Sequence, residues 1–131
     1  MARTLYQKLG IRPGDQIQVF HSPVPYHELV PETGDEEIME DGAAAESLDF
    51  IHLFCLNEEV LMAEIGLCKA MLKKGGMLWV SWPKGTSSIS TDINREDVRK
   101  TGLQAGLVDV KVASINDDWS GLKFVYRTQD R

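Results

Sequence analysis

Runs of apolar residues along the chain alternate between the period of strands and the period of helices. Residues 49–57, DFIHLFCLN, are almost continuously apolar, which is typical of a strand buried on both faces of a sheet. Asn57 then suits the N-cap of a following helix, and Gly75 is expected to end that helix in a left-handed conformation. One face of the helix is predicted from apolar residues spaced three or four apart: Leu61, Ile65, Cys68 and Leu72.

The same patterns predict further elements on both sides of this strand and helix. A short helix starts at Thr4 and ends at Gly10, and a second runs from Asn94 to about Gln104. Strands are predicted near 16–21, at 76–82 and in a hairpin over 107–127. Because strands alternate with helices, we expect an α/β, Rossmann-like fold: a mostly parallel sheet with helices on both faces and a C-terminal antiparallel β-hairpin. A length of 131 residues predicts one domain, residues 1–131.

Charge and composition indicate which kinds of partner and which cellular compartment to expect. The net charge is -6, which argues against nucleic acid and against an anionic membrane surface as partners. No apolar run approaches the ~20 residues of a membrane span, and the first ten residues lack the core of a signal peptide. We therefore expect a cytoplasmic protein. Two cysteines in apolar surroundings, Cys55 and Cys68, fit that reducing compartment as buried thiols.

Three segments resemble the Rossmann-like, class I methyltransferases. LKKGGMLWVSWPKG, residues 72–85, resembles the segment in which a helix ends in Lys/Pro-Gly-Gly and leads into the fifth strand. Residues 50–72 resemble the fourth strand and its helix, and residues 106–127 resemble the closing hairpin. This resemblance implies a methyltransferase-like, truncated version of that fold.

A closer resemblance covers most of the chain. The motifs LGIRPG at 9–14, WVSWPK at 79–84 and GLVDVKVASINDDWSGLKFVYR at 106–127 resemble a small bacterial family of uncharacterised proteins, catalogued as a domain of unknown function. The resemblance implies a fold and brings no assigned activity.

The end of the first strand departs from the methyltransferase pattern. Those enzymes need a glycine-rich turn there, because only glycine lets the backbone approach S-adenosylmethionine closely. This chain has FHSPVPYHEL at 20–29, and proline is stiff, bulky and without an N–H. The acidic interval 31–48 is also short for the usual adenosine pocket, although Glu36, Glu37 or Asp41 could offer a ribose ligand. We expect no S-adenosylmethionine site, and no other cofactor is indicated.

Ligands of open α/β sheets bind beyond the carboxyl ends of the strands, where three loops of this chain should meet. These loops are residues 21–26, 57–59 and 83–92, and the last of them is rich in hydroxyl groups. An anion could lie between Lys84 and the start of the helix near Asn94, and Trp82 could form the floor for a planar ligand. The candidate ligand-binding residues are Lys84, Trp82, Ser87, Ser88, Thr91, Asp92, His21, Ser22 and Tyr26.

Other chemistry has weaker support in the sequence. His21 and His27 are too few for a metal site, no zinc-ligand spacing is present, and no metal is predicted. A Ser-His-Asp triad from Ser22 or Ser81 lacks the G-x-S-x-G elbow. His52 lies in the buried strand and is expected to be a hydrogen-bonded core histidine.

Three functional hypotheses remain open from the sequence. The favoured one is a non-catalytic module that binds a small ligand or a protein through a methyltransferase-like scaffold. The second is an enzyme that holds an anionic substrate at Lys84 with His21 as acid or base. The third is a methyltransferase with a reshaped cofactor loop.

Overall fold

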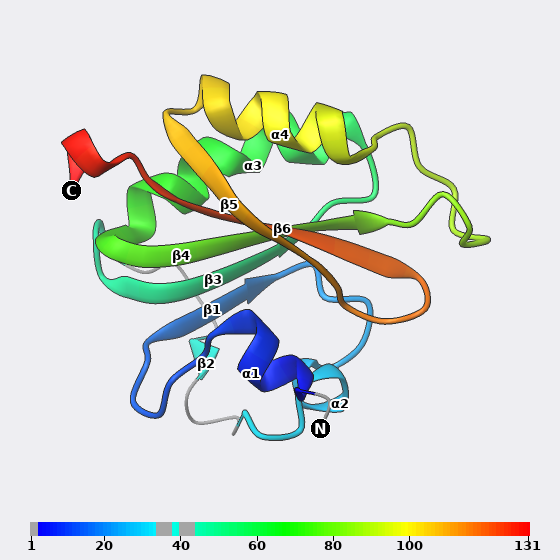
Figure 1. Cartoon of the computed structure of the whole chain (residues 1–131), viewed down its shortest axis with the longest axis horizontal. Helices are drawn as coiled ribbons and strands as arrows, with labels where there is room; N and C mark the ends of the chain where they lie inside the picture. The colour runs from blue at the N-terminus through cyan, green and yellow to red at the C-terminus, as the bar shows by residue number, and fades with distance from the viewer. Residues whose placement is uncertain (1–2, 34–37, 40–43) are drawn as a thin grey trace.

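The computed structural model describes residues 3–33, 38–39 and 44–131. In this structure a single mixed sheet lies between two layers of helices (Figure 1). The helices α3 and α4 cover one face, and α1 and α2 lie on the other. The elements in chain order are α1 (Leu5–Leu9), β1 (Ile17–Phe20), α2 (Tyr26–Leu29), β2 (Ile38–Met39), β3 (Leu48–Phe54), α3 (Glu58–Met71), β4 (Leu72–Pro83), α4 (Arg95–Gln104), β5 (Leu107–Ser114), β6 (Trp119–Tyr126) and a 3-10 helix (Thr128–Asp130).

The strand order confirms the Rossmann-like prediction and refines the position of the hairpin. The six strands follow the order β2-β1-β3-β4-β6-β5, and the first four are parallel. Strand β6 is antiparallel to both β4 and β5, so the last strand in sequence inserts between them and β5 forms the edge. The expected antiparallel C-terminal hairpin is therefore present.

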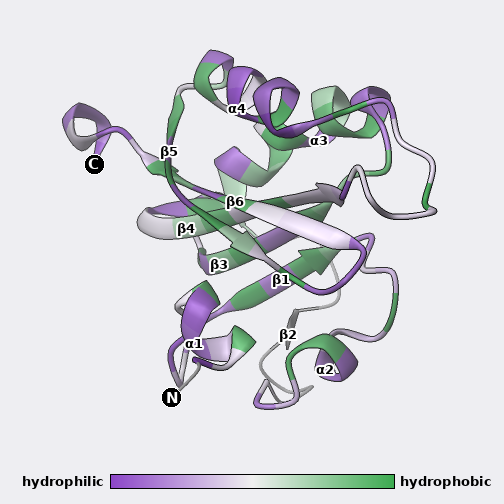
Figure 2. Cartoon of the chain, turned by 45° about the vertical axis from the view of Figure 1, so that its right-hand side comes forward, coloured by the Kyte–Doolittle hydropathy of each residue, from purple (hydrophilic) through white to green (hydrophobic). Residues whose placement is uncertain are grey.

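Both faces of the central strands are buried, as the apolar run at 49–57 predicts. Ile51 and Leu53 of β3 pack toward α3 and α4, and Phe50 and Phe54 pack toward α1 and α2. Figure 2 shows hydrophobic residues concentrated along the middle of the sheet, while α4 carries many hydrophilic ones. The position of β1 and β3 in the interior brings their carboxyl ends together at one edge, on the right in Figure 1.

Side-chain caps begin three helices, at the residues where the sequence predicts these helices to start. Thr4 and Gln7 form a capping box at α1, and Gly10 closes that helix with a φ of 82°. Asn57 accepts a hydrogen bond from the Val60 N–H at the start of α3. Asn94 forms the equivalent box at α4.

The predicted end of α3 at Gly75 is wrong. The helix ends at Met71, and Leu72 is already extended and starts β4 without a connecting loop. Leu72 is completely buried and pairs with Leu48 of β3, so its burial favours the earlier strand over a glycine cap. The glycine that the geometry requires is Gly76, where a Cβ would lie 3.0 Å from the carbonyl oxygen of Leu48.

Candidate functional site

A mostly apolar pocket lies at the carboxyl ends of β1 and β3, where the fold predicts a ligand site. Its cavity volume is about 300 Å³. The lining residues come from the end of β3, the first turn of α3, the start of β6 and the loops after β1, β3 and β4: His21, Pro23, Phe54, Leu56, Asn57, Val60, Ile89 and Trp119. This combination of an apolar wall and a few polar groups is typical of small-molecule sites.

Two aromatic side chains form the inner wall of the pocket. Phe54 ends β3, and Trp119 starts β6 opposite Pro83 of β4. Their rings meet edge to face, with centroids 5.3 Å apart and an interplanar angle of 79°. The turn before Trp119 is closed by Asn116, whose side-chain oxygen accepts a hydrogen bond from the Trp119 N–H at 2.9 Å. Both side chains are nearly completely buried, with exposed fractions of 1% for Phe54 and 4% for Trp119.

His21 lies at the mouth of the pocket in a backbone conformation that favours glycine. Its φ is 60°, in the left-handed region, directly after the last residue of β1. Its Nε2 lies 2.5 Å from Oε2 of Glu64 on α3, and the two side chains are 53% and 25% exposed. At the end of β1, where the resemblance to methyltransferases implies a glycine turn, this chain has a left-handed residue that carries an imidazole.

The proline loop after His21 is fixed by hydrogen bonds to itself and to the core. Ser22 donates from Oγ to the carbonyl of Val24 at 2.6 Å. Tyr26 is buried, and its hydroxyl lies 2.7 Å from Nδ1 of His52 in β3. Burial raises the pKa of Tyr26, which therefore remains a neutral phenol. The loop is thus held in place before any ligand binds.

His52 is the hydrogen-bonded core histidine that the sequence predicts. Its Nε2 lies 2.7 Å from Oγ of Ser81, and its ring stacks on Phe54 with a centroid distance of 4.1 Å. Burial lowers the pKa of His52 to about 3, so the ring is neutral. Ser81 and His52 are both completely buried, so no substrate can reach this pair, and it cannot act as a hydrolytic triad.

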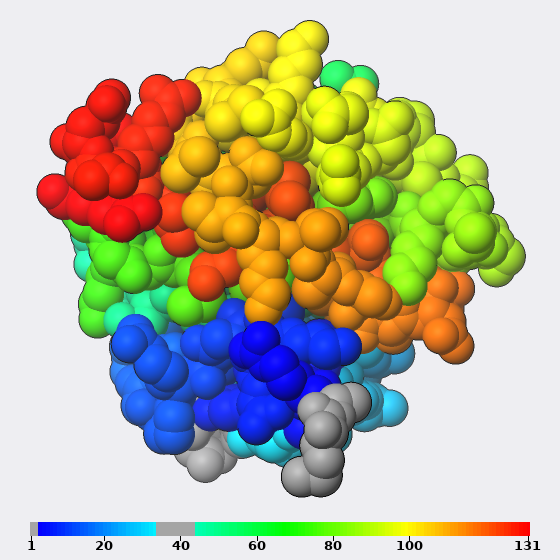
Figure 3. Space-filling model, in the orientation of Figure 1, coloured from blue at the N-terminus to red at the C-terminus, as the bar shows by residue number. Residues whose placement is uncertain are grey.

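The hydroxyl-rich loop uses its predicted binding residues to hold its own conformation. Lys84 Nζ donates to Ser114 Oγ at 2.7 Å, and Ser87 Oγ donates to Asp118 at 2.8 Å, so both side chains turn toward the β5–β6 hairpin. Thr91 accepts from the Ile93 N–H. Figures 1 and 3 show this loop projecting from the body of the molecule. None of these side chains lines the apolar pocket.

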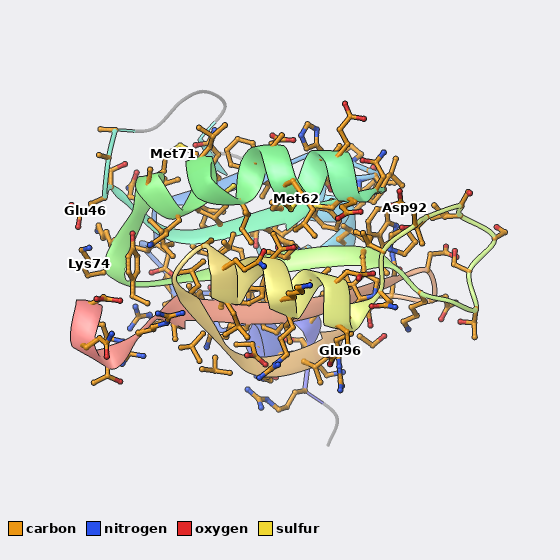
Figure 4. The ribbon with its side chains drawn as sticks, turned by 90° about the horizontal axis from the view of Figure 1, so that it is seen from above. Glu46, Met62, Met71, Lys74, Asp92 and Glu96 are labelled. Atoms are coloured by element: carbon orange, nitrogen blue, oxygen red, sulfur yellow. The ribbon has the colours of Figure 1, made fainter. Side chains whose placement is uncertain are left out.

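The remaining predicted residues are also separated from the pocket. Asp92 lies beside the N-terminus of α3 (Figure 4) and accepts the Glu58 N–H at 2.9 Å. Trp82 packs in the core under α3 and α4, on the face opposite Trp79, as the strand period predicts. Ser88 is exposed. Of the nine candidates, only His21 lines the pocket.

Other reactive groups do not form a site within the part of the chain that the structure describes. No group of three His, Cys, Asp or Glu side chains in 3–33, 38–39 and 44–131 could hold a metal ion. Burial raises the pKa of Cys55 and of Cys68 to about 12, so both remain protonated thiols. Glu36, Glu37 and Asp41 lie outside the described residues. No helix among the described residues is long and apolar enough to cross a membrane.

The three loops predicted from the sequence contain four of the eight lining residues, and Glu64 and the other four lie outside those loops. Phe54, Leu56 and Val60 belong to a predicted apolar strand and the helix after it, and nothing local in their pattern distinguishes a pocket wall from a core. Glu64 did carry a signal. It is an acidic residue within the apolar face of α3, next to Ile65, and a charge at such a position requires a partner.

Comparison with known proteins assigns this chain to a family. The DUF3052 model, described as a protein of unknown function, matches residues 7–128, so the chain belongs to that family. The resemblance inferred from the sequence motifs is thereby confirmed. No curated protein matches the sequence significantly.

Solved structures with a similar fold include S-adenosylmethionine-dependent methyltransferases. A methyltransferase from Aquifex aeolicus is 13% identical, with a TM-score of 0.62 over 92% of this chain and 86% of that one. A TehB-like methyltransferase from Corynebacterium glutamicum is 10% identical, with a TM-score of 0.57 over 94% and 85%. A geranyl diphosphate methyltransferase in complex with S-adenosylmethionine is 9% identical, with a TM-score of 0.64 over 94% and 83%. At these identities the likeness shows a methyltransferase-like fold.

Proposed function

We propose that this chain is a small-molecule-binding module built on a methyltransferase-like scaffold, and that its apolar pocket holds a ligand other than S-adenosylmethionine. The observation that carries the proposal is the pair His21 and Pro23 at the mouth of the pocket. The cofactor turn of this fold needs close backbone approach, and both residues place side-chain atoms where glycine would leave space.

The character of the pocket supports a neutral, apolar ligand. The lining includes the apolar side chains of Phe54, Trp119, Leu56 and Val60, and no lysine or arginine is among the lining residues. A phosphate or carboxylate group would lose its hydration there without gaining a cation. Lys84, the anchor expected for an anionic substrate, is instead bonded to Ser114.

Isothermal titration calorimetry with S-adenosylmethionine and S-adenosylhomocysteine tests the first half of the proposal. We expect no binding heat with either compound at concentrations up to millimolar. Micromolar binding would show that the proline loop still accepts the cofactor and would favour a methyltransferase with an atypical loop.

Titration with the apolar probe para-methylanisole, followed by two-dimensional NMR, tests the second half. The three tryptophans give three indole N–H signals, and only Trp119 lines the pocket. We expect the Trp119 signal to move with probe concentration while those of Trp79 and Trp82 stay in place.

A matched pair of variants locates the probe. Leu56 lines the pocket and is 48% exposed, and Leu67 on α3 is 63% exposed and does not line it. Leu56→Arg should weaken probe binding, and Leu67→Arg should leave it unchanged. Equal behaviour of the two variants would contradict binding in this pocket.

A further inference from the structure

The polar group at the mouth of the apolar pocket is an oriented histidine rather than an isolated one. His21 lies in the loop after β1 and Glu64 lies in the middle of α3, and the two side chains are hydrogen-bonded to each other. We propose that this His21–Glu64 pair makes the pocket selective for neutral aromatic ligands that carry a hydroxyl group. The inference rests on the proposed function, because it assigns the chemical class of ligand that the same pocket takes.

The hydrogen-bond pattern fixes which nitrogen of His21 can face a ligand. A carboxylate only accepts hydrogen bonds, so Nε2 of His21 carries the proton that is donated to Glu64. In the neutral imidazole the other nitrogen, Nδ1, is then an acceptor. No other described side chain is hydrogen-bonded to His21, so Nδ1 is left to accept from a hydroxyl group.

The backbone of His21 is consistent with a functional position. A non-glycine residue with a φ of 60° is sterically disfavoured and persists only where the surroundings hold it. The bond from Nε2 to Glu64 ties the side chain of this strained residue to α3, across 43 positions of sequence. Strained residues held in this way cluster at ligand sites, because holding the side chain in one orientation prepares the site for its ligand.

The other lining groups define the rest of the ligand. Phe54 and Trp119 present an aromatic wall, which favours a flat ring. Asn57 uses its side-chain oxygen to cap α3, which leaves its amide N–H₂ as a hydrogen-bond donor at the rim. The carboxylate of Glu64 disfavours an anion beside His21. A phenol satisfies all three conditions.

The test compares para-cresol with para-methylanisole, which differ by the replacement of the hydroxyl hydrogen by a methyl group. Dissociation constants are measured from the Trp119 indole signal in the wild type and in His21→Gly, Glu64→Leu, Glu64→Gln and Glu59→Leu. Glycine fits the left-handed φ at position 21, so His21→Gly removes the imidazole without straining the loop. Glu59→Leu removes the same charge from an exposed site on α3 and serves as the control.

We expect the wild type to prefer para-cresol, and His21→Gly and Glu64→Leu to reduce that preference by about fivefold to tenfold. Glu64→Gln keeps an acceptor for Nε2 and should restore part of it, and Glu59→Leu should keep the wild-type ratio. If both probes bind equally well to the wild type, or if the ratio survives in Glu64→Leu and His21→Gly, the selectivity is refuted while the pocket stands. If neither probe binds, the proposed function fails as well.

Discussion

The buried histidine of β3 predicts a specific loss of stability in mild acid. His52 is completely buried between the hydroxyl groups of Tyr26 and Ser81. Protonation would require the ring to donate from both nitrogens in a site without a compensating negative charge. Desolvation therefore lowers the pKa of His52 to about 3 in the folded protein, against a reference value of 6.5.

The sign and size of the effect follow from these two pKa values of His52. Between pH 6.5 and 3 the unfolded chain binds a proton at His52 that the folded chain does not, so stability falls as the pH falls. The contribution is fully present above the unfolded pKa. It declines by about 2 kcal/mol between pH 7 and pH 5, and by about 5 kcal/mol once the pH is below 3.

Urea unfolding at pH 7 and pH 5 measures this loss, with His52→Gln as the comparison. Glutamine can hydrogen-bond to both hydroxyl groups but does not titrate, so the variant should lose about 2 kcal/mol less than the wild type over the same interval. Desolvation is the largest single influence on Asp49 and acts to raise its pKa, but the hydrogen bond from the Gln16 N–H and the charges of Lys73 and Arg12 together lower that pKa on balance, so protonation of Asp49 costs stability only at lower pH. Asp49 is common to both proteins and cancels. Parallel changes in the two proteins would refute the assignment of a neutral, buried His52.

Two further predictions concern packing and thiol chemistry. Gly102→Ala should destabilise the fold by about 1–3 kcal/mol, because its Cβ would lie 2.1 Å from the ring of Phe124. Gly66→Ala on α3 meets no atom within 4 Å and should stabilise the fold by about 0.5–1 kcal/mol. Urea unfolding of both variants measures these changes, and equal effects would contradict the close contact at Gly102. Because burial raises the pKa of Cys55 and Cys68 to about 12, neither thiol should react with iodoacetamide at pH 8 until urea unfolds the chain, and mass spectrometry of the native protein would expose any exception.

Much of the fold could be predicted because its signals are local and periodic. Each of these signals lies within a few neighbouring residues: the apolar run of β3, the capping residues Asn57 and Asn94, and the helix-ending glycine Gly10. The start of β4 could not be predicted in this way. Leu72 joins the strand because it pairs with Leu48, a contact between residues 24 positions apart that no window of sequence contains.

The site was less predictable than the fold for a related reason. The hydroxyl groups in the loop after β4 predict a binding surface. In the structure Ser87 is hydrogen-bonded to Asp118 and Thr91 to the Ile93 N–H, and these bonds stabilise the loop itself. The wall of the pocket comes instead from apolar side chains that look like core residues in the sequence. Whether Trp119 lies beside Phe54 depends on the insertion of β6 next to β4, and that order became known only from the structure.

Two histidines, buried His52 in β3 and His21 at the pocket mouth, connect the scaffold to its proposed use. His52 holds Tyr26, and Tyr26 in turn fixes the loop that carries Pro23 and His21. A loop fixed from below does not need a ligand to order it, so binding should cost little conformational entropy. Under the proposed function, the left-handed residue after β1 has a different role from a glycine turn. It places the imidazole of His21 in hydrogen-bonding contact with Glu64 at the pocket mouth.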